Sequence, residues 1–488
     1  MSESRTPEAR PRPIRPFDLA FLVAETHAEP LHVGALLVFD APPSGAGWTP
    51  AGLVAAYRAS ALVAPFNRLA EFPLLGAPRW RQCERPDMRY HVQHLRLPAP
   101  GGERELCELV QEMHSSPLDR GQPLFRLYVI EGLADGGFAL FAKTHHALVD
   151  GISGLMRIVA SLSADARALP QPPFFAAMPS AGRRAPRATD RALARAAEAL
   201  REQARAAGEL SASALRKLGA ALAGTPEANT LFVAPVTPIN RPVHNGRALA
   251  LLSLPLGALR EIGHAAGGTI NDVALAIVDA AVNRYLEDRH AGVQRPLVAM
   301  APVSLRAKGD TQATTKATAM VAALGDPGAT LPARLKQIVA RVQAAKAEVR
   351  AMSDAAAMDN AIAMYALVVG LGSLGVEHPG VNLIVSNIPG PEGDLFLGGA
   401  RLRGIYPANA LSIRVGLNVT LVSQGGQMHM GFVSDRSQLQ DPERVAALSD
   451  EAFGQLARAA ARRSKGTSAP RKDKRAAGRR RTVSRKGD

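Results

Sequence analysis

The sequence predicts an α/β protein built from two halves. At 488 residues the chain is too long for one compact core, and its hydrophobic fraction of 47% supports a sizeable interior. Strand-like and helix-like segments alternate before residue 180 and again after residue 240, and a stretch rich in Pro, Ala and Ser begins at Pro170. We therefore expect two α/β halves joined by a crossover.

The first half contains a predicted β-hairpin that runs into two histidines. Residues 124–133 and 138–144 are rich in β-branched and aromatic residues, and the Ala-Asp-Gly-Gly between them is a turn signal. A helix is expected at about residues 155–162, where apolar residues recur at helical spacing. His145 and His146 then lie at the end of a strand, where a rigid sheet can hold a side chain at a cleft.

The second half is predicted to alternate in the same way, after a long helix at residues 189–223. The expected strands are 249–256, 297–304, 381–386 and a hairpin from 415 to 434, and the expected helices are 272–286 and 331–350. The apolar stretch 361–376 is short for a bilayer, so a core helix is favoured over a lipid-contacting surface. The division is an N-terminal half at 1–180, a linker and helix at 181–240, a C-terminal half at 241–460 and a basic, disordered tail at 461–488.

Much of the net charge of +15 lies in that tail, which has twelve Lys or Arg against two Asp between Arg462 and Asp488. Such a tail suits an anionic membrane or lipid-droplet surface, with nucleic acid or no dedicated partner as alternatives. The N-terminus has no apolar signal segment, so a cytoplasmic protein is expected. Cys83 and Cys107 lack zinc-site spacing and are expected to be buried thiols, and no metal is expected.

The histidine pair is followed by Asp150 and Gly151, which completes the pattern H-H-x-x-x-D-G. Imidazole titrates near neutrality, so it can take a proton from an attacking hydroxyl and return it to a leaving group. From the residues alone, Asp150 could hold the imidazole directly or pair with an arginine and fix the loop. The pattern is similar to the acyltransfer signature of the chloramphenicol acetyltransferase-like and condensation-domain superfamily.

The resemblance extends over roughly residues 14–456, to the bacterial wax ester synthase/acyl-CoA:diacylglycerol acyltransferase family. The similar blocks are PFDLAFLVAETHAEPLHVGALLVF at 16–39, MRYHVQHLRLPAPG at 88–101, SSPLDRGQPLFRLYVIEGL at 115–133, TINDVALA at 269–276, APVSLR at 301–306, VSNIPGP at 385–391 and LNVTLVS at 417–423. Many members have Trp where this chain has Phe125. The family implies two chloramphenicol acetyltransferase-like α/β sandwich halves with the active-site channel between them.

The resemblance also implies roles for individual residues. It makes His146 the general base and His145 its positioning neighbour, and it pairs Asp150 with Arg306 of the other half. Asn271 and Asp272 match the family's Asn-Asp motif. From the residues alone they read as a helix N-cap and a first-turn carboxylate, and Asn271 could also donate a hydrogen bond to the thioester oxyanion.

The implied activity is transfer of a long-chain acyl group from acyl-CoA to diacylglycerol, a long-chain alcohol or both. Acyl-CoA is a co-substrate, and no permanently bound cofactor is expected. The alternatives are a condensation-type acyltransferase with another acceptor or a carrier-bound donor, and a non-catalytic lipid-droplet-binding protein. A peripheral position on a membrane or lipid droplet is expected. Acceptor preference, chain length and oligomeric state stay open, with a homodimer as one option.

Overall fold

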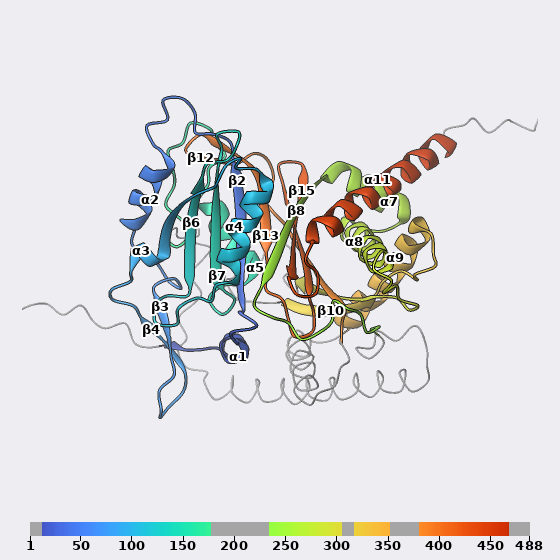
Figure 1. The fold of residues 1–488 in the computed structure, drawn as a ribbon, viewed down its shortest axis with the longest axis horizontal. Coiled ribbons are helices and arrows are strands. Elements are labelled where there is room, and N and C mark those ends of the chain that lie inside the picture. The colour runs from blue at the N-terminus through green and yellow to red at the C-terminus, as the bar shows by residue number, and fades with distance from the viewer. Residues whose placement is uncertain (1–11, 177–233, 305–316, 352–379, 468–488) are drawn as a thin grey trace, which may run out of the picture.

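The computed structural model describes residues 12–176, 234–304, 317–351 and 380–467. Two six-stranded sheets stand side by side with helices packed around them (Figure 1). The predicted long helix at 189–223, the apolar stretch at 361–376 and Arg306 lie outside these ranges.

The first sheet carries the histidine pair and has the order β12-β13-β2-β7-β6-β5. Its strands are β2 (His32–Phe39), β5 (Val92–Arg96), β6 (Phe125–Glu131), β7 (Phe138–His145), β12 (Phe396–Leu397) and β13 (Ala400–Ala408). The predicted hairpin is confirmed as the antiparallel pair β6 and β7. Every residue of β7 is buried, so the strand that ends in the histidines lies in the middle of the sheet.

Among the described residues, five helices belong to this part of the fold. They are α1 (Pro16–Ala24), α2 (Pro50–Arg58), α3 (Met88–His91), α4 (Glu103–Ser115) and α5 (Gly151–Ala160). α5 begins at Gly151, four residues earlier than predicted, because the Asp150 side chain caps it by accepting a hydrogen bond from the Ser153 N–H at 2.7 Å. The same part of the fold has a small three-stranded sheet, whose strands in order are β1 (Arg12–Pro13), β4 (Arg79–Gln82) and β3 (Arg68–Glu71).

The second sheet has the order β10-β9-β11-β14-β15-β8. Its strands are β8 (Arg247–Pro255), β9 (Val298–Ser304), β10 (Ala317–Ala323), β11 (Leu383–Ile388), β14 (Leu417–Gln424) and β15 (Gln427–Asp435). The predicted strands and the turn at Gly425 and Gly426 are confirmed. Four helices pack beside this sheet, α7 (Leu256–Ala266), α8 (Ile270–Glu287), α9 (Leu331–Arg350) and α11 (Pro442–Thr467), and share its core (Figure 1).

The chain crosses between the sheets at β13. This strand lies in the C-terminal half of the sequence but pairs antiparallel with β2 of the first sheet, with Pro407 opposite Ala35. The next strand, β14, returns to the second sheet. The expected division after residue 240 therefore does not separate the two sheets, because residues 396–408 complete the first one.

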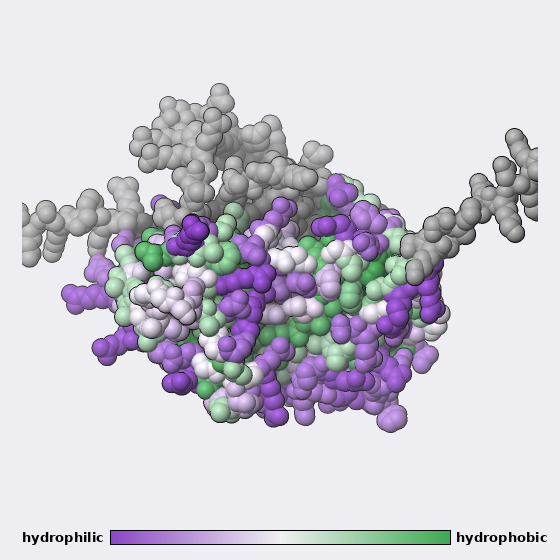
Figure 2. Space-filling model, turned by 90° about the horizontal axis from the view of Figure 1, so that it is seen from above, coloured by the Kyte–Doolittle hydropathy of each residue, from purple (hydrophilic) through white to green (hydrophobic). Residues whose placement is uncertain are grey.

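Two further features bear on the expected surface of the protein. α11 continues to Thr467, so residues 461–467 of the expected tail are helical, and the rest of the tail lies outside the described residues. Within the described ranges no single helix is long and apolar enough to span a membrane; α7 and α8 meet the length and composition only together, across a bend of 94°. The face seen from above mixes hydrophilic and apolar residues over both halves (Figure 2).

Candidate active site

The backbone of the histidine pair is held from both sides of β7. The His145 N–H donates to the Leu124 carbonyl at 2.9 Å, and the His146 N–H donates to the Leu31 carbonyl at 3.0 Å. The chain then turns, with the Leu148 N–H donating to the His145 carbonyl at 3.0 Å. These bonds fix the backbone of both histidines at the end of β7, where the sequence placed them.

His145 is committed to the fold. Its side chain is fully buried, and its Nδ1 accepts a hydrogen bond from the Ala147 N–H at 3.1 Å. Because Nδ1 accepts this hydrogen bond, Nε2 is the ring nitrogen that carries a proton, and it lies 3.4 Å from Oε1 of Glu25. His145 is therefore held at Nδ1 by the backbone, while its Nε2 faces the Glu25 carboxylate.

His146 is arranged differently. The ring of Phe21 stacks on it with centroids 4.2 Å apart and planes 13° apart. Its Nδ1 is buried and has no hydrogen-bond partner among the described residues. Burial, reinforced by the neighbouring His145, lowers the pKa of His146 to about 4. The ring is therefore neutral at physiological pH, which is the form that can accept a proton.

Glu25, which follows α1, connects these contacts. Its carboxylate faces His145, accepts the Leu31 N–H at 3.1 Å and accepts the Arg120 Nη2–H at 2.9 Å. Burial alone would raise the pKa of Glu25, but its contacts with His145, Arg120 and Leu31 outweigh burial and lower the pKa to about 2. Glu25 thus ties the histidine strand to the segment that also binds the His146 backbone.

The sequence did not single out Glu25 or Phe21, although both lie in the opening block at residues 16–39. The two residues are more than one hundred positions away from the histidines, and no local pattern joins them. The sequence pointed to these residues only indirectly, because the whole block at 16–39 resembles the opening block of the family.

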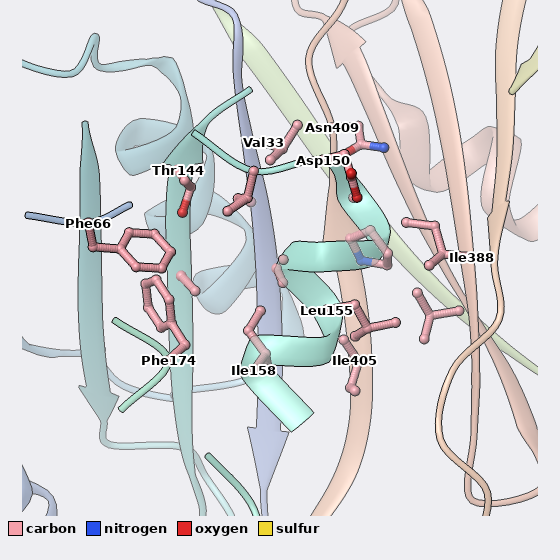
Figure 3. A pocket seen from close by; sticks show the side chains of 18 residues that line it. Val33, Phe66, Thr144, Asp150, Leu155, Ile158, Phe174, Ile388, Ile405 and Asn409 are labelled. Atoms are coloured by element: carbon pink, nitrogen blue, oxygen red, sulfur yellow. The ribbon is translucent and has the colours of Figure 1, made fainter. Parts of the chain in front are cut away.

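An apolar cavity lies between the two halves beside the histidine loop (Figure 3). Its wall includes Asp150, Gly151 and residues of β2, β7 and α5 on one side, and residues of β13, β14 and the end of β11 on the other. The cavity is narrow, with a volume of about 50 Å³. Phe66 and Phe174 close one end of it (Figure 3). Most of the residues that line it are apolar.

The histidines themselves do not line this cavity. Ala142 and Thr144 of β7 do line it, and His146 follows directly after the end of that strand. Gly151 lies close to the other half, since a Cβ there would be 3.0 Å from Cδ1 of Ile388. The motif therefore reaches the cavity through Asp150 and Gly151.

The Asn-Asp motif lies in the first turn of α8, where Asp272 was expected, but Asn271 is not the predicted cap. Thr269, not Asn271, is the N-cap of α8, and Asp272 completes a capping box by accepting the Thr269 N–H and O–H at 2.8 Å each. Asn271 lies inside the first turn. Neither Asn271 nor Asp272 lines the cavity.

Other expected chemistry can be placed briefly. Burial raises the pKa of the Cys107 thiol to about 12, and Cys83 is half-buried. Within the described ranges, no three His, Cys, Asp or Glu side chains gather in a way that could hold a metal ion. Arg306, the expected partner of Asp150, lies outside those ranges.

Comparison with known proteins gives the same family for both halves. The model of the wax ester synthase/diacylglycerol acyltransferase catalytic domain matches residues 14–274, and that of the family's C-terminal domain matches residues 316–457. A Mycobacterium tuberculosis protein named "Probable diacyglycerol O-acyltransferase Tgs4" is 33% identical over 467 residues, covering 91% of this chain and 96% of that protein.

Solved structures extend the likeness to the fold. The wax ester synthase/diacylglycerol acyltransferase from Marinobacter aquaeolei VT8 is similar with a TM-score of 0.74 and 29% identity, covering 92% of this chain and all of that one. The first condensation domain of the CDA synthetase shares the fold at a TM-score of 0.59 and 18% identity, over 93% and 97% of the two chains. The chain belongs to the wax ester synthase/diacylglycerol acyltransferase family and has its two-halved, chloramphenicol acetyltransferase-like fold.

Proposed function

We propose that this acyltransferase moves a long-chain acyl group from acyl-CoA to a lipid hydroxyl, with His146 as the general base. Diacylglycerol as acceptor gives triacylglycerol, and a long-chain alcohol gives a wax ester. The observation that carries the proposal is the state of His146: its low pKa leaves the ring neutral, and its buried Nδ1 has no hydrogen-bond partner in the part of the chain that the structure describes. The names of the similar proteins support the substrate class.

The reaction needs one base and no covalent enzyme intermediate. His146 takes the hydroxyl proton as the oxygen attacks the thioester carbonyl, so a C–O bond forms and the carbonyl oxygen becomes an oxyanion. Collapse of this tetrahedral intermediate breaks the C–S bond, and the protonated His146 returns the proton to the CoA thiolate. Donors placed at the oxyanion would stabilise the intermediate, and Asn271 is our candidate for one of them.

The remaining motif residues have supporting roles in this proposal. His145 fixes the position of His146, and Gly151 allows the second half to approach the loop. Asp150 caps α5 and pairs with Arg306, which ties the loop to the other half without taking a proton. The apolar lining of the cavity between the halves favours an acyl or acceptor chain there.

We also propose that the protein works at the surface of a membrane or lipid droplet. Diacylglycerol and long-chain alcohols partition strongly out of water, because each buried methylene contributes about 0.8 kcal/mol. An enzyme that uses such acceptors finds them at a much higher concentration at a lipid surface than in water.

The proposal is tested by offering one radiolabelled acyl-CoA to the purified protein with hexadecanol, diacylglycerol or monoacylglycerol in parallel. His146→Ala should lower turnover about 10²- to 10⁴-fold while the protein keeps its fold. His264→Ala, on the exposed side of α7, is the matched control and should retain full turnover. Residual activity of His146→Ala within about tenfold of the parent would refute the base assignment. Dependence on a carrier-bound donor would instead favour a condensation-type reaction.

A further inference from the structure

The hairpin formed by β3 and β4 carries an unusual concentration of exposed apolar side chains. Its tip, residues 72–78, contains Phe72, Leu74 and Leu75, whose relative exposures are 47%, 104% and 92%. These are three of the seven large hydrophobic residues that are exposed in the described ranges. Three exposed apolar side chains are therefore concentrated on one short loop, which projects from the lower left of the molecule (Figure 1).

The strands behind this tip are positively charged. The small sheet β1-β4-β3 carries Arg12, Arg68, Arg79 and Arg81, and its one acidic residue, Glu71, faces Arg79 at 2.6 Å and Arg81 at 3.9 Å. Arginine next to an apolar tip matches the layers of a lipid surface, where anionic headgroups lie above hydrocarbon.

The hairpin is firmly attached to the body of the protein. Trp80 of β4 is 7% exposed and belongs to the core of the first half, together with Ile14. The Ile14 N–H also donates to the Pro78 carbonyl at 3.1 Å. The leucines at the tip are thus presented to solvent by a fixed support.

The same attachment connects the tip with the histidine site. β1 pairs with β4, and α1 begins at Pro16, three residues after β1 ends. α1 carries Phe21, which stacks on His146. A surface that binds the hairpin would therefore lie near α1, the helix whose Phe21 contacts the proposed base.

We propose that the β3–β4 tip inserts into an anionic phospholipid surface, with Phe72, Leu74 and Leu75 in the hydrocarbon and the arginines of the small sheet at the headgroups. This proposal rests on the proposed function for the choice of lipid as partner. It also predicts how the enzyme is oriented on the membrane: the edge of the first half that carries α1 faces the surface that supplies the acceptor.

The test measures binding of the full chain to vesicles of phosphatidylcholine with and without phosphatidylglycerol. Leu74→Ser combined with Leu75→Ser should lower the partition coefficient at least about tenfold, since both side chains lose their transfer into hydrocarbon. Leu169→Ser combined with Val236→Ser is the matched control, because those residues are 72% and 66% exposed elsewhere. The control should stay within about twofold of the parent.

The charge is tested with Arg12→Gln combined with Arg81→Gln, which should weaken the dependence of binding on phosphatidylglycerol. All variants keep the basic tail, so its contribution cancels between them. Binding of the leucine variant within twofold of the parent would overturn the proposal. So would a change in its oligomeric state in solution, because the tip would then be a contact between copies of the chain.

Acyltransfer to a short, water-soluble alcohol separates this proposal from the proposed function. The leucine variant should keep parental turnover with that acceptor and lose turnover with diacylglycerol held in vesicles. If the parent had no acyltransfer with any acceptor, the proposed function would fail, and the vesicle-binding result would still decide the role of the tip.

Discussion

Replacing Glu25 with glutamine tests whether its charge holds the histidine pair. The pKa of this carboxyl is lowered from 4.5 to about 2, and one pKa unit corresponds to about 1.4 kcal/mol. The ionised side chain therefore contributes about 3 kcal/mol to folding at neutral pH. Its side chain is only 9% exposed, so water screens this contribution little.

Glu25→Gln should lower the free energy of unfolding by about 3 kcal/mol, measured by urea denaturation at pH 7. Because the pKa is lower in the folded protein, the contribution is present above pH 4.5 and is lost as pH falls toward 2. The difference between parent and variant should therefore shrink over that range. Glu108→Gln is the control, since the Arg104–Glu108 pair lies in water on α4 and should affect stability little.

The same variant should lower kcat by about ten- to a hundredfold with little change in KM, because His145 loses its ionised acceptor while no substrate contact is removed. A double-mutant cycle with Arg120→Gln should show coupling, since Arg120 donates to the same carboxylate. If Glu25→Gln matched Glu108→Gln in both stability and kcat, the positioning role of Glu25 would be wrong.

Three further predictions follow from the site and from the contact between the halves. The acid limb of kcat/KM should lie near pH 4 and not near 6.5, because His146 must lose its proton to act and its pKa is about 4; an inflection near 6.5 in a pH-rate profile would contradict this. Asp150→Ala should lose about 0.5–2 kcal/mol of stability with the cap of α5, whereas Asp150→Asn should recover stability but not turnover; full turnover of Asp150→Asn would argue against a need for its charge. Gly431→Ala should destabilise by about 1–3 kcal/mol, because its Cβ would meet the Pro407 carbonyl oxygen, while Gly257→Ala has open space and serves as control; equal melting temperatures would count against the packing of β13 on β15.

Local patterns were sufficient to predict much of the fold. The β6–β7 hairpin was predicted because a clear turn signal separates two apolar runs, and α9 was predicted at residues 331–350, as observed. The start of α8 was misplaced because Asn271 is a good capping residue, whereas the reciprocal bonds of Thr269 and Asp272 place the cap two residues earlier.

Features that depend on distant pairing were not predictable from one sequence. β13 contains Pro407, which argues against a strand, and its partner β2 lies more than three hundred residues away. The contact of Glu25 with His145 has the same character. The histidine motif was found because it is contiguous, but its supports come from other parts of the chain.

The exchange of β13 also determines what would happen if the chain were cut. A single cleavage between residues 181 and 230 would sever the covalent link, yet the larger C-terminal fragment would still supply β12 and β13 to the sheet of the smaller one. The two fragments should therefore copurify as one particle. Either fragment produced alone would have an exposed strand edge: the N-terminal one would expose the backbone of β2, and the C-terminal one would carry β13 without its partner β2. The two halves of the sequence are therefore joined by a shared sheet as well as by the chain.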